Sequence, residues 1–258
     1  MKVATFNANS IRARLSIILD WLEQEAPDIL CVQETKVQDK DFPLSPFMEA
    51  GYHVTFRGQK SYNGVAIVSR SPQELLDSSL GAENDSAARL ITARIDGLVV
   101  VNVYVPQGVE VGSPKFQYKL SWLADLLAYI RAHYHPEDLL LLAGDFNVAL
   151  EPRDVYDPEG LAGAVGFHPR EQSGFRELLT WGLVDLFREH VQDGGRYTFW
   201  DYRVPNGFKR NLGWRIDYLL ATPPLAKKSV KAWIDTRPRT LQRPSDHTFL
   251  VAELDLKA

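Results

Sequence analysis

The 258-residue chain has a single cysteine, Cys31, which stands in the apolar run Ile29–Val32. One thiol excludes an internal disulfide bond, so we expect a protein of a reducing compartment such as the cytoplasm. A thiol among apolar residues is usually buried and inert, so cysteine-based catalysis is not indicated. The chain also lacks the Cys and His cluster of a zinc site.

Long apolar segments are missing as well, since no stretch approaches the ~20 residues that a transmembrane helix needs. Only four residues separate Met1 and Lys2 from the polar Asn7, so the amino terminus does not resemble a secretory leader. Internal repeats and Gly/Ser/Pro linkers are absent too. We therefore predict one domain spanning residues 1–258. We expect it to be monomeric and cytoplasmic, or associated with the nucleoid in a prokaryote, with no membrane partner.

Net charge is slightly negative, at −4, which by itself argues weakly against a nucleic-acid partner. The distribution is uneven, because ten basic residues and only two acidic ones fall between Arg203 and Arg243. This stretch carries +8 and the rest of the chain −12. Such asymmetry suits either a surface that follows a phosphate backbone or a solvated basic face without a partner, and charge alone leaves both open.

Short apolar runs rich in Val, Ile and Leu recur at strand length throughout the chain. They are Val3–Phe6, Ile29–Val32, Val65–Val68, Leu98–Val105, Leu139–Ala143, Tyr218–Ala221 and Phe249–Leu254. Spacings of three and four residues predict helices around Leu15–Leu22, from Ser113–Pro114 through Tyr129, and over Arg170–Trp181. Strands mixed with helices predict an α/β sandwich of two packed sheets with helices outside.

Polar residues stand at the ends of these predicted strands. Four strands run into such residues and two later strands begin on them. The residues are Asn7, Glu34, Tyr104, Asp145 with Asn147, Asp217, and Asp246 with His247. If the two later strands run antiparallel to the four, all of these groups meet at one edge of the sandwich. Each alone has an ordinary explanation as a turn, cap or surface ion pair, but together they suggest a functional site.

The types of these residues indicate a chemistry. Carboxylate and amide oxygens suit a hard cation such as Mg²⁺ or Mn²⁺. A cation, an oriented imidazole and an activated water together describe hydrolysis of a phosphodiester. The sequence has no G-x-S-x-G motif and no P-loop, so a serine nucleophile and nucleotide-driven phosphoryl transfer are not indicated.

Six sequence blocks, in order and spanning nearly the whole chain, resemble those of the exonuclease III and AP endonuclease family. They are Thr-Phe-Asn-Ala-Asn-Ser-Ile-Arg (5–12), Val-Gln-Glu-Thr-Lys (32–36), Tyr-Asn-Gly-Val-Ala-Ile (62–67), Gly-Asp-Phe-Asn (144–147), Gly-Trp-Arg-Ile-Asp-Tyr (213–218) and Ser-Asp-His (245–247). The resemblance is to bacterial-type members of the wider endonuclease/exonuclease/phosphatase superfamily. It implies a DNase I-like four-layer α/β sandwich, with two mixed β-sheets packed face to face.

The resemblance also implies an activity. We expect a Mg²⁺-dependent DNA-repair phosphodiesterase, with Mn²⁺ able to substitute, that hydrolyses duplex DNA on the 5′ side of abasic sites. It should also have 3′–5′ exonuclease activity and clean 3′ ends as a phosphatase or phosphodiesterase. Its partner would be double-stranded DNA with abasic sites or 3′ ends.

Matching positions receive roles from the same resemblance. Glu34 resembles the principal metal ligand, with Asn7 close to it and Asp246 near the metal or a second metal position. Asp145 and Asn147 resemble the pair that orients the attacking water and binds phosphate. The His247–Asp217 dyad and Tyr104 resemble groups that contact the phosphate. The number of metals, and whether His247 or Asp145 is the base, stay open.

Substrate contacts are expected from two groups of residues. Lys115 and Lys119 are candidates for contacts with backbone phosphates. Phe199, Trp214 and Ile216 resemble a small apolar pocket for a flipped, base-free sugar, with Arg215 among the basic residues beside it. The loop Leu161–Phe167 should border this pocket, where Gly163 and Gly166 leave room for the sugar. Trp200 lies in the same stretch and is as easily a core residue.

Three alternatives remain open. A nonspecific DNase I-like nuclease would cut intact DNA as well as abasic DNA. A phosphoinositide phosphatase would more plausibly carry a membrane segment or interfacial helix. A catalytically silent nucleic-acid-binding regulator would have lost catalytic positions, whereas this chain keeps every one that can be matched. One departure is Asn9, where some animal-type relatives have Asp, which could weaken a second metal position.

Overall fold

Strands fall into two six-stranded sheets within residues 1–81 and 87–256, the part of the chain that this computed structural model describes. The first sheet has the order β11 (Ser229–Asp235), β12 (Phe249–Leu254), β1 (Lys2–Asn7), β2 (Ile29–Gln33), β4 (Val65–Ser69) and β3 (His53–Arg57). The second has the order β5 (Glu74–Asp77), β6 (Leu90–Ile95), β7 (Leu98–Tyr104), β8 (Leu140–Asp145), β10 (Asp217–Ala221) and β9 (Val184–Asp185).

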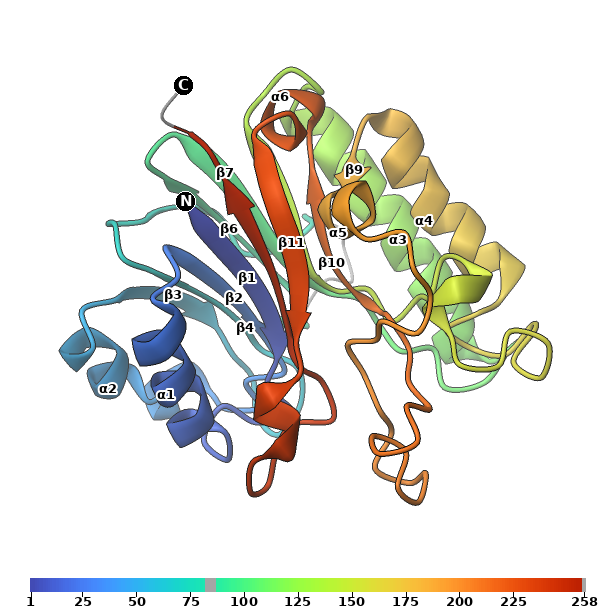
Figure 1. Ribbon diagram of the computed structural model, residues 1–258. Coiled ribbons are helices and arrows are strands. Elements are labelled where there is room, and N and C mark those ends of the chain that lie inside the picture. The colour runs from blue at the N-terminus through green and yellow to red at the C-terminus, as the bar shows by residue number, and fades with distance from the viewer. Residues whose placement is uncertain (82–86, 257–258) are drawn as a thin grey trace.

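Helices cover the outer face of each sheet, so the molecule has four layers (Figure 1). Helices α1 (Leu15–Glu25) and α2 (Leu44–Glu49) lie outside the first sheet, and α3 (Pro114–His133) and α4 (Pro169–Trp181) lie outside the second. The shorter helices are α5 (Leu186–His190), α6 (Pro223–Ala226), and the 3₁₀ turns at Asp39–Asp41, Pro152–Asp154 and Arg237–Thr240. None of the helices in the described ranges has the length and apolarity to cross a membrane.

Local sequence explains where the two long outer helices begin. Ser113 precedes α3, its side chain accepts a hydrogen bond from Phe116 N (3.2 Å), and Pro114 occupies the first turn, where no amide donor is needed. Helix α4 begins in the same way. His168 is the capping residue, Pro169 occupies the first turn, and Glu171 completes a capping box. The predicted helix start at Ser113–Pro114 is confirmed.

Apolar side chains separate into three main clusters, one between each pair of layers. Strand β1 shows how alternation divides them, because Val3 points into the cluster between the sheets while Ala4 and Phe6 point towards α1. The cluster under α3 and α4 includes Trp122 and Phe175. Because both faces of each central strand are buried, these strands read as continuous apolar runs in the sequence.

Strand directions bring the predicted polar ends together. Strand β1 is parallel to β2, and β7 is parallel to β8, so Asn7 pairs with Gln33 and Tyr104 pairs with Asp145. Strand β10 is antiparallel to β8, which places Asp217 opposite Asp145, and β12 is antiparallel to β1. The antiparallel arrangement expected for the two later strands is confirmed, and the ends meet at the lower end of the sandwich in Figure 1.

All seven predicted strands and all three predicted helices are present, but five strands were not predicted. Among them β6 (LITARI) and β11 (SVKAWID) place polar residues inside the run, so a search for continuous apolar stretches passes over them. Strand β3 is half-exposed at the edge of the first sheet, and β9 has only two residues. Edge strands have less apolar sequence because only part of their surface is buried.

A buried amide pair links the two sheets directly behind the polar edge. Gln33 of β2 donates from Nε2 to Asn102 Oδ1 of β7 (2.7 Å) and to Thr5 Oγ1 of β1 (2.9 Å). Asn102 donates in turn to the backbone oxygens of Val32 (3.0 Å) and Ala66 (2.8 Å) across the interface. Gln33 precedes Glu34 and Asn102 lies two residues before Tyr104, so this pair sets the relative position of the two strand ends.

Replacing Asn102 with leucine should destabilise the fold, because buried partners of its amide lose their hydrogen bonds. Each such loss costs about 1–3 kcal/mol of the free energy of unfolding. Urea denaturation followed by circular dichroism measures the change. The exposed pair Arg94–Glu74 on the same sheet provides a control, since Arg94→Ala should have little effect. Equal stability of Asn102→Leu and wild type would show that the amide pair is dispensable.

Candidate active site

A single amide joins two carboxylates at the polar edge. Asn7, the last residue of β1, donates from Nδ2 to Glu34 Oε1 and to Asp145 Oδ2, both at 2.8 Å. The two acids follow or end strands of different sheets, and this amide holds them side by side. Asn7 Oδ1 accepts from the backbone N of Asn9 (2.9 Å). This oxygen keeps a second lone pair, so Asn7 as a metal ligand stays a prediction.

Several residues of the site have backbone conformations in the left-handed region, Glu34 and Asn147 among them. Glu34 has φ +51° and Asn147 has φ +53°, both in the left-handed region. Asparagine adopts this backbone conformation at little cost. For glutamate the conformation is unfavourable, so contacts with surrounding residues must stabilise it. The backbone oxygen of Glu34 accepts a hydrogen bond from Ser10 N (2.8 Å), and Asn147 N donates to Asp145 Oδ1 (2.8 Å). These contacts turn both side chains towards the polar edge.

An imidazole stands between two more carboxylates. His247 Nδ1 lies 2.8 Å from Asp217 Oδ2, and its Nε2 lies 3.7 Å from Asp145 Oδ2. Asp217 opens β10 and His247 precedes β12, so the dyad joins the two sheets. All three side chains are at least 95% buried. The predicted pairing of His247 with Asp217 is present in the structure.

Burial and crowding shift the acid–base properties of this group. Burial raises the pKa of Asp145 to about 7, with Asp217 and Glu34 adding to the rise while His247 opposes it. Burial by itself lowers the pKa of an imidazole, but Asp217 and Asp145 outweigh it and raise the pKa of His247 to about 10. At neutral pH His247 is therefore a cation with an N–H on each ring nitrogen, and Asp145 is divided between its two forms.

The phenol of Tyr104 faces the same acids. Burial raises its pKa well above the ordinary value, and the charges of Glu34 and Asp145 raise it further. The guanidinium of Arg89 lies over the ring of Tyr104, 4.7 Å from its centroid, and Arg89 also donates to the backbone oxygen of Tyr104 (3.0 Å). Tyr104 is consequently a protonated donor at the polar edge, supported from behind by a cation.

A second chain of contacts connects Glu34 with Asp246. Lys36 Nζ lies 2.7 Å from Glu34 Oε2 and also donates to Asn9 Oδ1. Asn9 in turn donates to Asp246 Oδ1 (2.9 Å). Burial raises the pKa of Glu34, but Lys36 and the hydrogen bond from Asn7 outweigh it, so the pKa falls below its usual value. The surface ion pair considered for Glu34 exists, and it is part of the site rather than an alternative to it.

The donor set fits a hard divalent cation. Glu34, Asp145 and Asp246 offer carboxylate oxygens, and Lys36 already places a positive charge on Glu34. Burial, more than the neighbouring acids, raises the pKa of Asp145. Asp145, Asp217 and His247 also lie close enough to share an ion. Within that trio, one ring nitrogen of His247 is already engaged, since Nδ1 lies 2.8 Å from Asp217 Oδ2.

An apolar cluster adjoins the imidazole. Phe199 packs against His247 with ring centroids 4.9 Å apart, and it joins the cluster of Ala149, Val155, Leu161, Phe167, Trp214 and Ile216. A Cβ at Gly166 would lie 3.3 Å from the Trp214 ring, so a side chain there would press on the cluster. A Cβ at Gly163 would meet nothing within 4 Å. The loop Leu161–Phe167 therefore borders the predicted apolar residues, and Gly166 is the glycine that matters for space.

One predicted phosphate contact is wrong. Lys119 has 0% of its side chain exposed and pairs with Glu171, so it cannot reach a DNA strand outside the protein. Its spacing on α3 puts it on the inner face of the helix, with Phe116 and Leu123, which are also buried. Lys115, one turn earlier, is exposed and stays a candidate.

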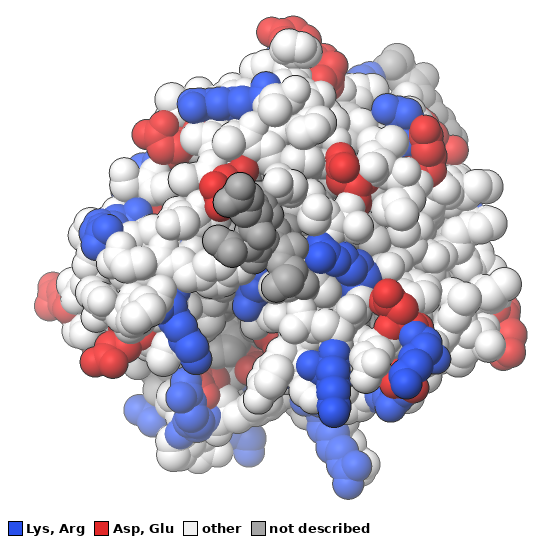
Figure 2. Space-filling view, turned by 180° about the vertical axis from the view of Figure 1, so that it is seen from behind, with Lys and Arg blue, Asp and Glu red and all other residues white. Residues whose placement is uncertain are grey.

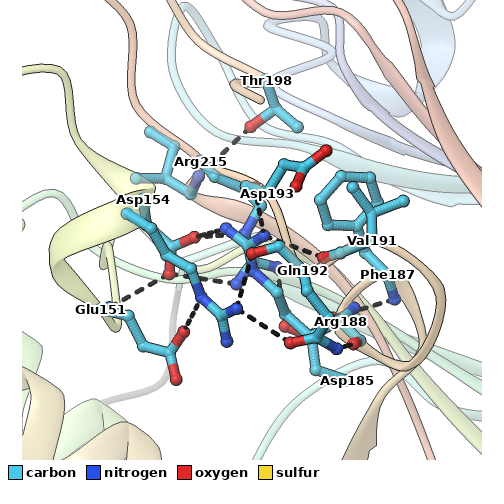
Figure 3. Close-up of polar contacts among 12 residues, drawn as sticks. Glu151, Asp154, Asp185, Phe187, Arg188, Val191, Gln192, Asp193, Thr198 and Arg215 are labelled. Carbon is cyan, nitrogen blue, oxygen red and sulfur yellow. Dashed lines mark hydrogen bonds and ion pairs between the residues drawn. The ribbon is translucent and has the colours of Figure 1, made fainter. Parts of the chain in front are cut away.

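A second predicted substrate contact, Arg215, is also buried. Its guanidinium pairs with Asp154 (2.7 Å) and Asp185 (2.7 Å), and Arg188 pairs with the same Asp154 (Figure 3). The network ties the 3₁₀ turn at residues 152–154 to α5 and to the strand that begins at Asp217. Arg215 thus stabilises the fold beneath the apolar cluster and does not contact substrate. Trp200 is 2% exposed, in agreement with the core alternative.

The basic stretch of residues 203–243 does not form one surface. Arg215 is buried, Arg237 pairs with Asp235 and Glu25, and Lys231 pairs with Glu253. Lys227 and Lys228 follow α6, at the opposite end of β10 from the site. On the one face that Figure 2 shows, Lys and Arg side chains lie among Asp and Glu side chains. Charge counted along the sequence overstated the basic surface, because Arg215 is buried and other cations of the stretch are paired with carboxylates.

Sequence reasoning missed Lys36, Arg89 and Ser245 as members of the site. Ser245 Oγ donates to the backbone oxygen of Asn7 (2.7 Å) and accepts from His247 N (3.2 Å), which fixes the loop that carries Asp246 and His247. The Ser-Asp-His block contains it, so the signal was available. Arg89 carried no such signal, since its place over Tyr104 depends on the pairing of β6 with β7.

Comparison with known proteins places these features in context. Residues 4–247 match the endonuclease/exonuclease/phosphatase family. An AP endonuclease from Archaeoglobus fulgidus is 45% identical, with a TM-score of 0.97 over 99% of this chain and 100% of that one. A 3′ phosphatase from Neisseria, solved with a product DNA hairpin, is 39% identical with a TM-score of 0.95 over 99% of each chain. Exodeoxyribonuclease III of Haemophilus influenzae is 32% identical over 98% of this chain and 99% of that protein. The predicted fold class is confirmed.

Removing the buried cation at position 215 should be strongly destabilising. Arg215→Met removes a cationic partner from the carboxylates of Asp154 and Asp185, which are shielded from water. Removing one member of a buried ion pair lowers the free energy of unfolding by about 3–5 kcal/mol. Guanidinium denaturation monitored by tryptophan fluorescence measures the change. Arg203→Ala, which removes an exposed arginine paired with Asp201, is the control expected to change little. A stable Arg215→Met protein would contradict the structural role given to this network.

Stability in the presence of a chelator should fall as the pH rises from 7 to 10. The pKa of His247 is raised to about 10 in the folded protein, against about 6.5 when unfolded, so its stabilisation is complete below the lower value. That stabilisation is lost as the pH passes through the folded value. Asp217→Asn should reduce this slope, because it removes the nearest carboxylate. Parallel pH profiles of urea midpoints for the two proteins would count against the assignment.

Proposed function

The chain belongs to the endonuclease/exonuclease/phosphatase family, and from this premise we propose that it is a DNA-repair phosphodiesterase. It hydrolyses duplex DNA on the 5′ side of abasic sites and processes 3′ ends as a 3′–5′ exonuclease and 3′ phosphatase. The names of its relatives span these activities: AP endonuclease, 3′ phosphatase and exodeoxyribonuclease III.

One observation carries this proposal. Two carboxylates joined by Asn7 and an imidazolium held by Asp217 stand immediately beside an apolar cluster, through the contact of Phe199 with His247. The polar group suits a phosphodiester and the apolar group suits a sugar without its base. A nonspecific nuclease would need the polar group but not the apolar cluster.

The proposed cofactor is Mg²⁺, with Mn²⁺ able to replace it. Glu34 is the proposed principal ligand and Asp246 a further one. When bound, the ion would neutralise phosphate charge and stabilise the leaving oxygen. Carboxylate ligands without cysteine favour magnesium or manganese over zinc.

Residues of the chain supply the remaining chemistry. Asp145, whose pKa is raised to about 7, is poised to accept the proton of the attacking water. His247 is protonated and tied through Nδ1 to Asp217, so its Nε2 N–H is available to a phosphoryl oxygen rather than serving as the base. Tyr104 and Asn147 are further donors where charge grows in the transition state.

Substrate choice is assigned to the apolar cluster. Flipping a nucleotide out of the duplex costs least where no base pair has to be broken, which favours an abasic nucleotide. Phe199, Trp214 and Ile216 would receive the sugar, and Lys115 would contact a backbone phosphate. A monomer acting in the cytoplasm, or at the nucleoid of a prokaryote, is part of the same proposal.

A gel assay on four labelled duplexes tests the function. They carry an abasic analogue, a 3′-phosphate, a recessed 3′ end or no lesion. We expect Mg²⁺-dependent cutting at the abasic analogue, release of the 3′-phosphate and trimming of the recessed end, with the intact duplex largely spared. Equal internal cutting of the intact and abasic duplexes would favour a nonspecific nuclease instead.

Two controls accompany this assay. EDTA should remove activity, and Mg²⁺ or Mn²⁺ should restore it. Asp145→Asn should lower the rate by at least about 10²-fold while DNA binding, measured by fluorescence anisotropy, is largely kept. Wild-type protein that binds DNA but cleaves none of the duplexes with any metal would favour the regulator alternative.

A further inference from the structure

A buried ion pair outside the reacting groups has no evident task in the chemistry. Lys119 of α3 and Glu171 of α4 are both 0% exposed and in direct contact. Withdrawing two charges from water is unfavourable, and apolar residues in place of such pairs are often neutral or stabilising. A contribution to stability is therefore a weak explanation for the presence of this pair. The other hydrogen bonds of Lys119 and Glu171 indicate a further role.

Every donor of Lys119 is engaged. Besides Glu171 Oε1, its ammonium group donates to the backbone oxygen of Asn147 (2.7 Å) and to that of Gln107 (3.2 Å). Asn147 is the residue in the left-handed conformation that follows β8 and Asp145. Gln107 lies three residues after Tyr104. One ammonium group thus holds the segments that follow two catalytic strands.

Glu171 uses its second oxygen on a third segment. Its Oε2 accepts from the backbone N of Gly166 (2.8 Å) and from that of His168 (3.2 Å). Gly166 has φ +87°, and a Cβ there would lie 3.3 Å from the Trp214 ring and 3.4 Å from the backbone oxygen of Asn147. The loop bordering the apolar cluster is therefore fixed by the same pair, next to the turn that carries Asn147.

Neighbouring contacts make the three segments one unit. A Cβ at Gly108 would lie 3.2 Å from the side chain of Lys119 and 3.3 Å from that of Val165, so the segment after Tyr104 packs on the loop bordering the cluster. Ala149 N donates to the backbone oxygen of Gly166 (2.7 Å). A displacement of the loop at Gly166 would be passed to the turn after Asn147 through a backbone hydrogen bond, and to the segment after Tyr104 through the Val165 side chain.

We propose that Lys119 and Glu171 form a positioning pair that couples the donor Asn147 to the loop bordering the apolar cluster. Through Asn147 the pair acts on the rate of phosphate hydrolysis. Through Gly166 it acts on the preference for an abasic site over a 3′-phosphate end. The inference rests on the proposed function, because both readouts need the two substrates.

Two double variants separate these effects without leaving a buried charge. Lys119→Met/Glu171→Gln removes the ammonium group but keeps an oxygen for Gly166 N and His168 N. Lys119→Met/Glu171→Leu removes that oxygen too. Leu126→Ala, a buried position on the same helix with no part in the three segments, is the control for general destabilisation. Thermal denaturation sets a temperature at which all four proteins are folded.

Steady-state kinetics on abasic and 3′-phosphate duplexes give the outcome. The Met/Gln variant should lose about 10–100-fold in kcat on both substrates with KM little changed, as expected for a misplaced catalytic donor. The Met/Leu variant should also raise KM several-fold on the abasic duplex alone. Leu126→Ala should keep both wild-type values.

The contrary results are distinct. The positioning role would be overturned if the double variants kept wild-type kcat and KM. It would also be overturned if Leu126→Ala, at equal stability, lost as much kcat as they do. Either result leaves the proposed function in place. Wild-type protein that processes neither duplex would overturn the proposed function, and this inference with it.

Discussion

Repulsion among buried carboxylates is the constraint on which the site depends. Glu34, Asp145 and Asp217 converge at one edge, and burial there raises the pKa of Asp145 to about 7. Hydrogen-bond donors and cations of the protein offset this negative charge. They are the Asn7 amide, the His247 imidazolium and the Lys36 ammonium. In the proposed function, the raised pKa of Asp145 suits this residue to accept a proton.

The two sheets deliver these groups because strand register cannot slip. Moving a central strand by one residue would exchange the side chains of its two buried faces and upset the close packing of both clusters, so this packing holds each polar end in place. Asn102 and Gln33 then fix one sheet against the other directly behind Glu34 and Tyr104. The catalytic geometry is thus a property of sheet packing, and the loops at the edge only complete it.

The basic side chains of this protein have two kinds of role, one structural and one at the surface. Arg215 and Lys119 are fully buried, and each supports segments that carry site residues from beneath. Lys115 is exposed, and the proposed function gives it a contact with a backbone phosphate. Counting charge along the chain cannot separate the two kinds, because the same residue type serves both and only burial distinguishes them.

The sequence by itself determined the α/β class, the seven apolar strands, the three long helices and the residues that gather at the edge. It could do so because central strands are buried on both faces and because Asn7, Glu34, Asp145, Asp217 and His247 stand where such runs begin or end. Only the tertiary structure decided which acids share a partner, that His247 is held as a cation, and that Arg215 points inwards. These outcomes depend on contacts between residues far apart in the chain, which local spacing does not encode.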